Sequence, residues 1–194
     1  MRLIQKISLL LATLCAVVLS ACTTPGPSNA ELDQLTQQIL ASSFRAQGQA
    51  QLDRIQPDED NRLCAEADRT GVALDSKISQ AIEARNMATI KPPSNGKYLG
   101  DWKEGEKLAQ DGRGKTWSDK EGSVNGGNCY NCHKISNTEI SYGTLGPSLY
   151  NYGKLRGVTD VNSPNSKPII EYTWAKLWNA RSYNACSNMP RFGH

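Results

Sequence analysis

The chain has 194 residues, with 22 Lys and Arg against 19 Asp and Glu, so its formal net charge is only +3. A nucleic-acid-binding chain of this size would be expected to carry a stronger basic excess, so no nucleic-acid partner is predicted. Its 6 Cys outnumber its 2 His. Each of these thiols needs an assignment to a disulfide, a cofactor, a lipid or a buried position.

Residues 1–21 have the features of a bacterial export signal. Arg2 and Lys6 give a charged start, and the apolar stretch 7–19 is too short to span a membrane. The segment ends in Leu-Ser-Ala before Cys22, which resembles a lipobox, so we expect Cys22 to carry lipid. The alternative is an ordinary secretory signal that is cut nearby. A lipidated Cys22 predicts a protein anchored on the periplasmic face of the outer membrane. An ordinary secretory signal predicts a soluble periplasmic protein.

Residues 22–30 predict a flexible tether, and residues 31–95 a helical arm that ends in a linker rich in Pro and Gly. Pro57 to Asp60 predict a helix start, because Pro is favoured in the first turn and acids face the positive end of the helix dipole. Apolar residues at helical spacing form one stripe before this point and a second stripe that runs on across Gly71. They are Leu32, Leu35, Ile39 and Leu40, and then Leu63, Ala67, Leu74, Ile78, Ala81 and Ile82.

Two interpretations of this arm remain open: a hairpin packed on the following domain, or a docking arm for a partner. Residues 96–194 are long enough for one small domain. Within it, Asp101 predicts the cap of a helix through about Asp111, residues 112–127 are rich in glycine, and residues 167–181 predict an amphipathic helix. The sequence therefore predicts a mostly α protein.

Cys129, Cys132 and His133 form a C-x-x-C-H run, the attachment motif of a c-type haem. Two thiols on one turn can form thioethers to the two haem vinyl groups, and the next residue then presents its imidazole to the iron. The alternatives are a zinc half-site, which lacks a second ligand pair in this sequence, and a thioredoxin-like redox pair, which needs a βαβ setting. We therefore expect one covalently bound haem c.

The remaining cysteines and the second iron ligand follow from this assignment. Cys64 and Cys186 are left over, and in an oxidising compartment we expect a disulfide between them. The alternatives are two buried free thiols or a bond to a partner subunit. Met189 precedes a proline some tens of residues after the haem motif, a spacing that resembles class I cytochromes c. We expect Met189 to be the second axial ligand, with His194 or a packing role for Met189 as alternatives.

Several fragments between Tyr98 and His194 together resemble SoxX, the small monohaem subunit of the SoxAX cytochromes of bacterial sulfur oxidation. The most specific are Gly-Asn-Cys-x-x-Cys-His around Cys129 and Met-Pro-Arg-Phe-Gly from Met189, with Gly-Thr-Leu-Gly-Pro-Ser-Leu at 143–149. The resemblance implies a class I cytochrome c-like haem domain, here preceded by an N-terminal helical arm.

The resemblance also implies roles for individual residues. Cys129 and Cys132 would hold the haem, His133 and Met189 would ligate its iron, and the Pro147 carbonyl would orient the His133 ring. It further implies a heterodimer with a SoxA-like subunit, whose catalytic haem couples thiosulfate oxidatively to a cysteine of a SoxYZ-type carrier. This chain would accept the electrons and pass them to a soluble cytochrome. No catalytic base or nucleophile is recognisable, so we expect a non-catalytic subunit of an L-cysteine S-thiosulfotransferase complex.

Two features depart from that family pattern. No helix is expected after Met189, whereas class I cytochromes c have a C-terminal helix there, so either the chain lacks this helix or the arm replaces it. The lipobox at Cys22 suggests an anchor, whereas many of the relatives are soluble periplasmic proteins. Two other functions therefore stay open: a generic periplasmic electron shuttle without a dedicated partner, and a haem enzyme or sensor with an open iron site.

Overall fold

The computed structural model describes residues 26–193, so the predicted signal, Cys22 and His194 lie outside the described residues. The chain divides into two compact units, with the division between Phe44 and Arg45. It falls inside the predicted arm, so the later part of the arm belongs to the same unit as the C-x-x-C-H motif. Among the described residues there are helices and one isolated bridge between Gln47 and Ala50, but no strand. The mostly α class is thus confirmed.

The described part of the first unit is one helix, α2 (Asn29–Ser43). A capping box starts it: Ser28 Oγ accepts the Glu31 N–H, and the Glu31 carboxylate accepts the Ser28 N–H at 2.7 Å. The helix has no buried residue, and its predicted apolar stripe is exposed, with Leu32, Leu35 and Ile39 each more than two-fifths accessible.

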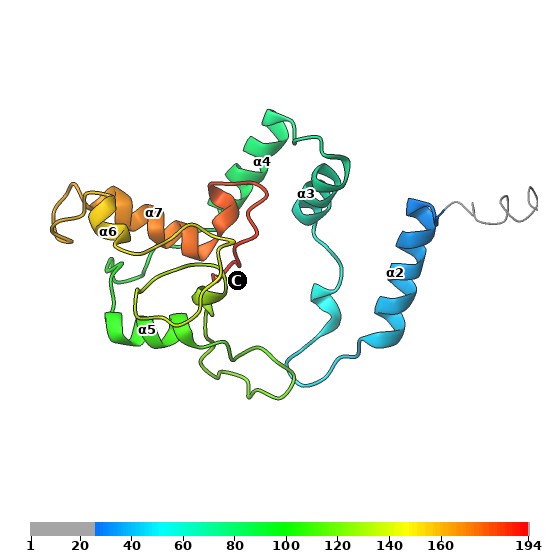
Figure 1. Cartoon of the computed structure of the whole chain (residues 1–194), viewed down its shortest axis with the longest axis horizontal. Helices are drawn as coiled ribbons and strands as arrows, with labels where there is room; N and C mark the ends of the chain where they lie inside the picture. Colours follow the sequence, from blue (N-terminus) through cyan, green and yellow to red (C-terminus); the bar gives the residue numbers. More distant parts are fainter. Residues whose placement is uncertain (1–25, 194) are drawn as a thin grey trace, which may run out of the picture. The chain divides into compact units, whose positions relative to one another are not determined.

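The second unit contains the other helices (Figure 1). Four of them are longer than two turns: α3 (Glu59–Thr70), α4 (Ser76–Met87), α5 (Trp102–Gln110) and α7 (Lys167–Trp178). The shorter elements are η1 (Leu52–Arg54), η2 (Cys129–Asn131), α6 (Tyr152–Leu155) and η3 (Ala180–Ser182). The predicted cap Asp101 begins α5, and α3 begins within the predicted helix start at Pro57 to Asp60, with Asp58 as its cap.

The continuous stripe predicted across Gly71 is wrong. Gly71 has a φ of +67°, a left-handed conformation that ends α3, and Asp75 then caps a separate α4. The helix predicted over 167–181 also ends early, at Trp178, because Asn179 adopts an extended conformation and a 3₁₀ turn follows. Apolar spacing could not reveal either break, because both depend on local backbone conformation.

Helices α3 and α4 pack on the C-terminal part of their own unit, as the hairpin interpretation of the arm expects. Helix α4 lies against η3, next to the C-terminal end of α7 (Figure 1). A disulfide joins Cys64 of α3 to Cys186, with the two Cα atoms 5.4 Å apart. Ile82 of α4 and Asn179 are fully buried at this contact.

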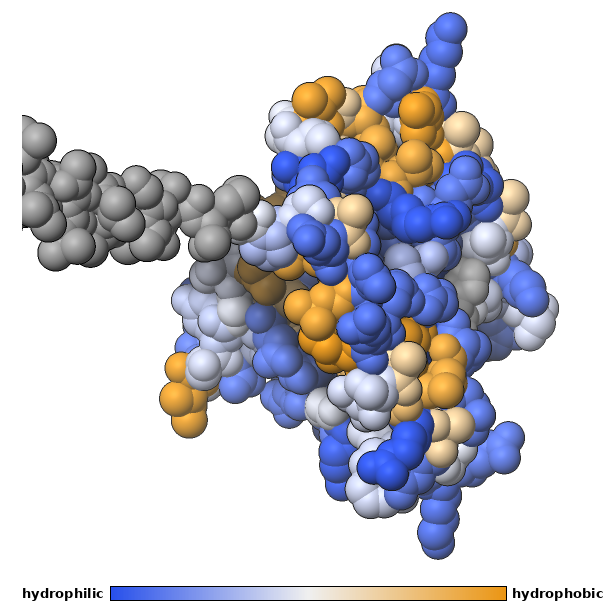
Figure 2. Space-filling view, turned by 90° about the vertical axis from the view of Figure 1, so that its right-hand side faces the viewer, coloured by the Kyte–Doolittle hydropathy of each residue, from blue (hydrophilic) through white to orange (hydrophobic). Residues whose placement is uncertain are grey.

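The core of the described chain is small, and many large apolar side chains stay accessible (Figure 2). In the second unit, Leu145 is 90% and Val124 76% exposed, and both belong to long loops. No helix within residues 26–193 is both long and apolar enough to cross a bilayer.

Candidate functional site

The glycine-rich segment folds back so that the residues before the C-x-x-C-H motif lie on the end of α5. The Gly127 N–H donates to the Leu108 carbonyl at 2.7 Å, and the Asn128 N–H donates to the Asp111 carbonyl at 3.0 Å. A Cβ on Gly126 would lie 1.8 Å from the Asp111 carbonyl oxygen, so this close approach requires glycine. Helix α5 thereby fixes the position of the turn that begins at Cys129.

Cys129, Cys132 and His133 share one turn. The Cys129 carbonyl accepts the N–H of Cys132 at 3.1 Å and the N–H of His133 at 2.9 Å. Both thiols are free and half-buried. Burial raises the pKa of the Cys129 thiol, and the neighbouring Cys132 raises it further. A thioredoxin-like nucleophile needs a lowered thiol pKa, so the redox-pair interpretation finds no support here.

The His133 ring is held by residues 143–149, the Gly-Thr-Leu-Gly-Pro-Ser-Leu segment described above. Its Nδ1 lies 2.7 Å from the Pro147 carbonyl oxygen. A carbonyl can only accept, so this bond places the ring proton on Nδ1 and leaves the Nε2 lone pair available to a metal. Gly146 packs on the same ring, since a Cβ there would lie 2.2 Å from His133 Cε1. From the sequence, Gly146 stood out only as part of the Gly-Thr-Leu-Gly-Pro-Ser-Leu motif. The structure shows that it leaves space for the His133 ring.

Backbone hydrogen bonds keep this segment beside the motif. The N–H groups of Gly143, Gly146 and Leu149 donate to the carbonyls of Tyr130, Cys132 and Lys134 at 2.7, 2.8 and 2.7 Å, respectively. The Lys134 ammonium lies over the rings of Tyr142 and Tyr150, 5.4 and 5.9 Å from their centroids. The position of the His133 partner is therefore set by a ladder of contacts along the segment.

The Met189 loop reaches the same region from the C-terminal side. Its Phe192 and Gly193 N–H groups donate to the last carbonyls of α7, those of Leu177 and Trp178, at 3.2 and 3.0 Å. A Cβ on Gly127 would lie 3.1 Å from Cys129 Sγ and 3.7 Å from the Phe192 ring. Phe192 and Cys129 therefore flank the same glycine, which brings the Met-Pro loop to the first cysteine of the motif. Met189 itself is half-buried.

The residues in the described chain suit a c-type haem in the chemistry of their donors. Two free thiols on one turn, an imidazole with a fixed tautomer and a nearby thioether loop are the groups that such a haem uses. No group of three or more His, Cys, Asp or Glu side chains within residues 26–193, this motif included, is arranged to share a metal ion.

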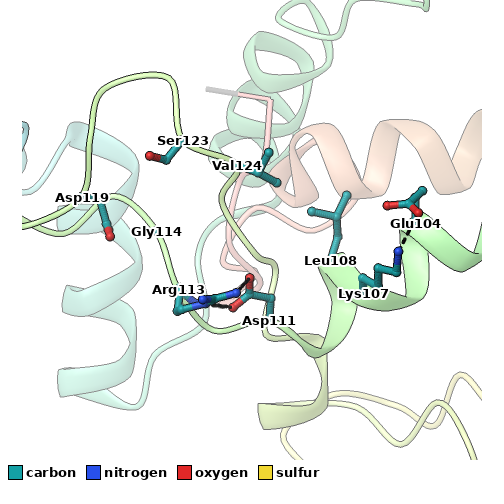
Figure 3. A pocket seen from close by; sticks show the side chains of 9 residues that line it. All are labelled: Glu104, Lys107, Leu108, Asp111, Arg113, Gly114, Asp119, Ser123 and Val124. Carbon is teal, nitrogen blue, oxygen red and sulfur yellow. Dashed lines mark hydrogen bonds and ion pairs between the residues drawn. The ribbon is translucent and has the colours of Figure 1, made fainter.

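A cavity of about 470 Å³ lies between α5 and the glycine-rich segment (Figure 3). Its lining is mostly charged, and two ion pairs neutralise much of that charge: Lys107 with Glu104 at 2.8 Å, and Arg113 with Asp111 at 3.0 Å. The hydrogen bond from Arg113 lowers the pKa of the Asp111 carboxyl. Cys129, Cys132 and His133 are not among its lining residues, so this cavity is distinct from the predicted haem site.

A buried polar cluster between α3, α4 and η3 was missed in the sequence. Asn179 Nδ2 donates to Asn86 Oδ1 at 2.8 Å, and Asn86 Nδ2 donates to Asp60 Oδ2 at 2.8 Å. Arg181, only 8% exposed, forms ion pairs with Asp58 at 3.3 Å and Asp60 at 3.8 Å. No periodicity marks such residues, because they come from separate segments: Asn86 and Asn179 are 93 positions apart, and Asp58 and Arg181 are 123 apart.

No family model matches the chain. A relative from Aquifex aeolicus (strain VF5), described as "Uncharacterized lipoprotein", is 37% identical over 108 residues. The match covers 55% of this chain and 47% of the relative, so the chain spans about half of that protein's length. The likeness is to a protein of undescribed activity, and it assigns no chemistry to the site.

Proposed function

We propose that this chain is an exported monohaem c-type cytochrome that transfers electrons as a SoxX-like subunit. Cys129 and Cys132 would hold the haem, and His133 and Met189 would ligate its iron. The haem, when bound, would supply a centre that takes up and releases one electron at a time. The observation that carries the proposal is the 2.7 Å hydrogen bond between His133 Nδ1 and the Pro147 carbonyl beside two free thiols on one turn.

The protein's own residues would orient the iron ligands. Pro147 holds the His133 tautomer that offers Nε2, and Gly146 leaves room for the ring. The loop after Cys186 carries Met189 toward the motif. We recognise no paired acid and base or activated nucleophile beside these residues, so the catalytic step would belong to a partner.

The partner would be a SoxA-like cytochrome subunit that couples thiosulfate to a SoxYZ-type carrier cysteine, and a soluble cytochrome would take the electrons onward. We further propose that Cys22 is lipidated and anchors the protein in the cell envelope, at the periplasmic face of the outer membrane. The description of the Aquifex relative as a lipoprotein supports the anchor. The resemblance over residues 98–194 supports the electron-transfer role.

Covalent haem is tested first. The exported protein should retain one haem after denaturation, and Cys129→Ser with Cys132→Ser should lose it. Cys64→Ser with Cys186→Ser controls for the loss of two cysteines: it destabilises the second unit but keeps both attachment thiols, so it should still carry haem after denaturation. Absence of covalent haem from the unchanged protein would refute the cytochrome assignment.

The place in sulfur oxidation is tested by reconstitution. The purified chain should not oxidise thiosulfate alone. Thiosulfate-dependent reduction of its haem should appear when a SoxA-like subunit and a carrier with the acceptor cysteine are added. Reduction by general donors together with no response to this partner would instead support the generic shuttle. Turnover by the chain alone would contradict the non-catalytic role.

A further inference from the structure

The loop that carries Met189 is tied to helix α3 on both sides of the methionine. Three residues before it, Cys186 is bonded to Cys64 of α3. Two residues after it, Arg191 Nη2 lies 3.0 Å from Oδ2 of Asp58, the residue that caps α3. Both ties thus run to the first two turns of one helix. That helix lies outside residues 98–194, the region in which this chain resembles SoxX.

Asp58 combines two tasks at the start of α3. Its Oδ1 accepts the Asn61 N–H at 2.7 Å, which caps the helix, and its carboxylate pairs with both Arg181 and Arg191. Partial burial raises the pKa of Asp58, but the bond from Asn61 and the positive charges of the two arginines outweigh it, so the pKa is lowered. The carboxylate is therefore charged at neutral pH and can hold Arg191.

Three side chains behind Asp58 are buried: Asp60, Asn86 and Arg181 are each less than one-tenth exposed. Arg181 also donates to the Asn61 side chain, and Asp60 of the same helix turn accepts from Arg85 and from Asn86 of α4. The first turn of α3 is thereby fixed to α4 and η3. By contrast, residues 183–193 form no helix, so the Met189 loop is held by these side-chain ties together with the backbone bonds of Phe192 and Gly193 to α7.

We propose that α3 is a positioning element for the axial methionine: Cys64 and Asp58 hold the two ends of the Met189 loop, and Asp58 and Arg191 are positioning residues. The proposal rests on the proposed function only in that Met189 ligates iron. The ties themselves belong to the polypeptide, so they can be tested without the haem.

The test uses Asp58→Asn in the full chain. Asparagine is as good a helix cap as aspartate, so α3 keeps its start while the charge that holds Arg191 is lost. The matched control is Asp75→Asn, which changes the cap of α4, where the carboxylate accepts the Lys77 N–H at 2.8 Å. Arg191→Gln removes the same ion pair from the other side, and Arg191→Lys should restore part of it.

The first readout is hydrogen exchange of the Phe192 and Gly193 amides. Loss of a partly exposed ion pair should speed their exchange about two- to fivefold in Asp58→Asn and Arg191→Gln, with no change in Asp75→Asn. The second readout, on haem-loaded protein, is the charge-transfer absorption of a methionine–ferric iron bond. It should weaken, and the reduction potential should shift, in the same two variants.

The outcomes separate this proposal from the function. If the unchanged protein binds no haem or shows no methionine absorption, the proposed iron ligation fails, and the exchange data still test the ties. If Asp58→Asn and Asp75→Asn behave alike in exchange, Asp58 does not hold the loop, which overturns the proposal. If exchange rises in Asp58→Asn while absorption and potential stay unchanged, α3 holds the loop without positioning the ligand, which overturns the proposal.

Discussion

The disulfide between Cys64 and Cys186 should be a large contributor to the stability of the second unit. The two residues are 122 positions apart, so the bond closes a long loop in the unfolded chain. On the chain-entropy model, a loop of this length corresponds to about 5 kcal/mol of stabilisation. The predicted perturbation is Cys64→Ser with Cys186→Ser, which should lower the free energy of unfolding by an amount of this order.

The assay is urea unfolding of the second unit, followed by the fluorescence of its tryptophans, with and without a thiol reductant. Reductant should lower the midpoint of the unchanged protein toward that of the double variant and leave the double variant itself unaffected. Non-reducing peptide mapping should find the linked pair. If the unchanged protein and the double variant differ by less than about 1 kcal/mol and respond alike to reductant, the reasoning is refuted.

Three further predictions concern the site and its support. Gly146→Ala should displace the His133 ring, because the new Cβ would lie 2.2 Å from it. Thermal unfolding should show a loss of about 1–3 kcal/mol in stability, and haem attachment should weaken. Gly100→Ala, whose Cβ would meet open space, is the control and should change neither stability nor haem attachment. Met189→Ala should abolish the methionine–ferric iron absorption and shift the reduction potential, and an unchanged spectrum would exclude Met189 as the ligand. The pKa of Asp58 lies below its ordinary value of 3.8. Its charge therefore contributes fully to stability above pH 3.8, and the contribution is lost as the pH falls through the lowered pKa. Asp58→Asn should flatten the acid limb of a stability–pH curve, and an unchanged limb would contradict this.

Local signals in the sequence were sufficient for much of the secondary structure and for the candidate chemistry. Asp58 and Asp101 mark the starts of α3 and α5 because a cap acts only on the amides that follow it. The thiols and imidazole of the C-x-x-C-H motif are adjacent in the chain, so one turn places them together. Pro147, named only through the family resemblance, lies at the His133 ring in the structure.

Tertiary structure decided how the parts of the arm divide and what supports the Met189 loop. Apolar spacing is the same for one long helix and for two short ones, so only the left-handed backbone at Gly71 separates α3 from α4. The tie from Asp58 to Arg191 spans 133 positions, and contacts in the cluster around Arg181 and Asn179 span 123 and 93 positions. Such contacts depend on where the chain returns to itself, which residue order alone does not specify, and the position of Met189 depends on them.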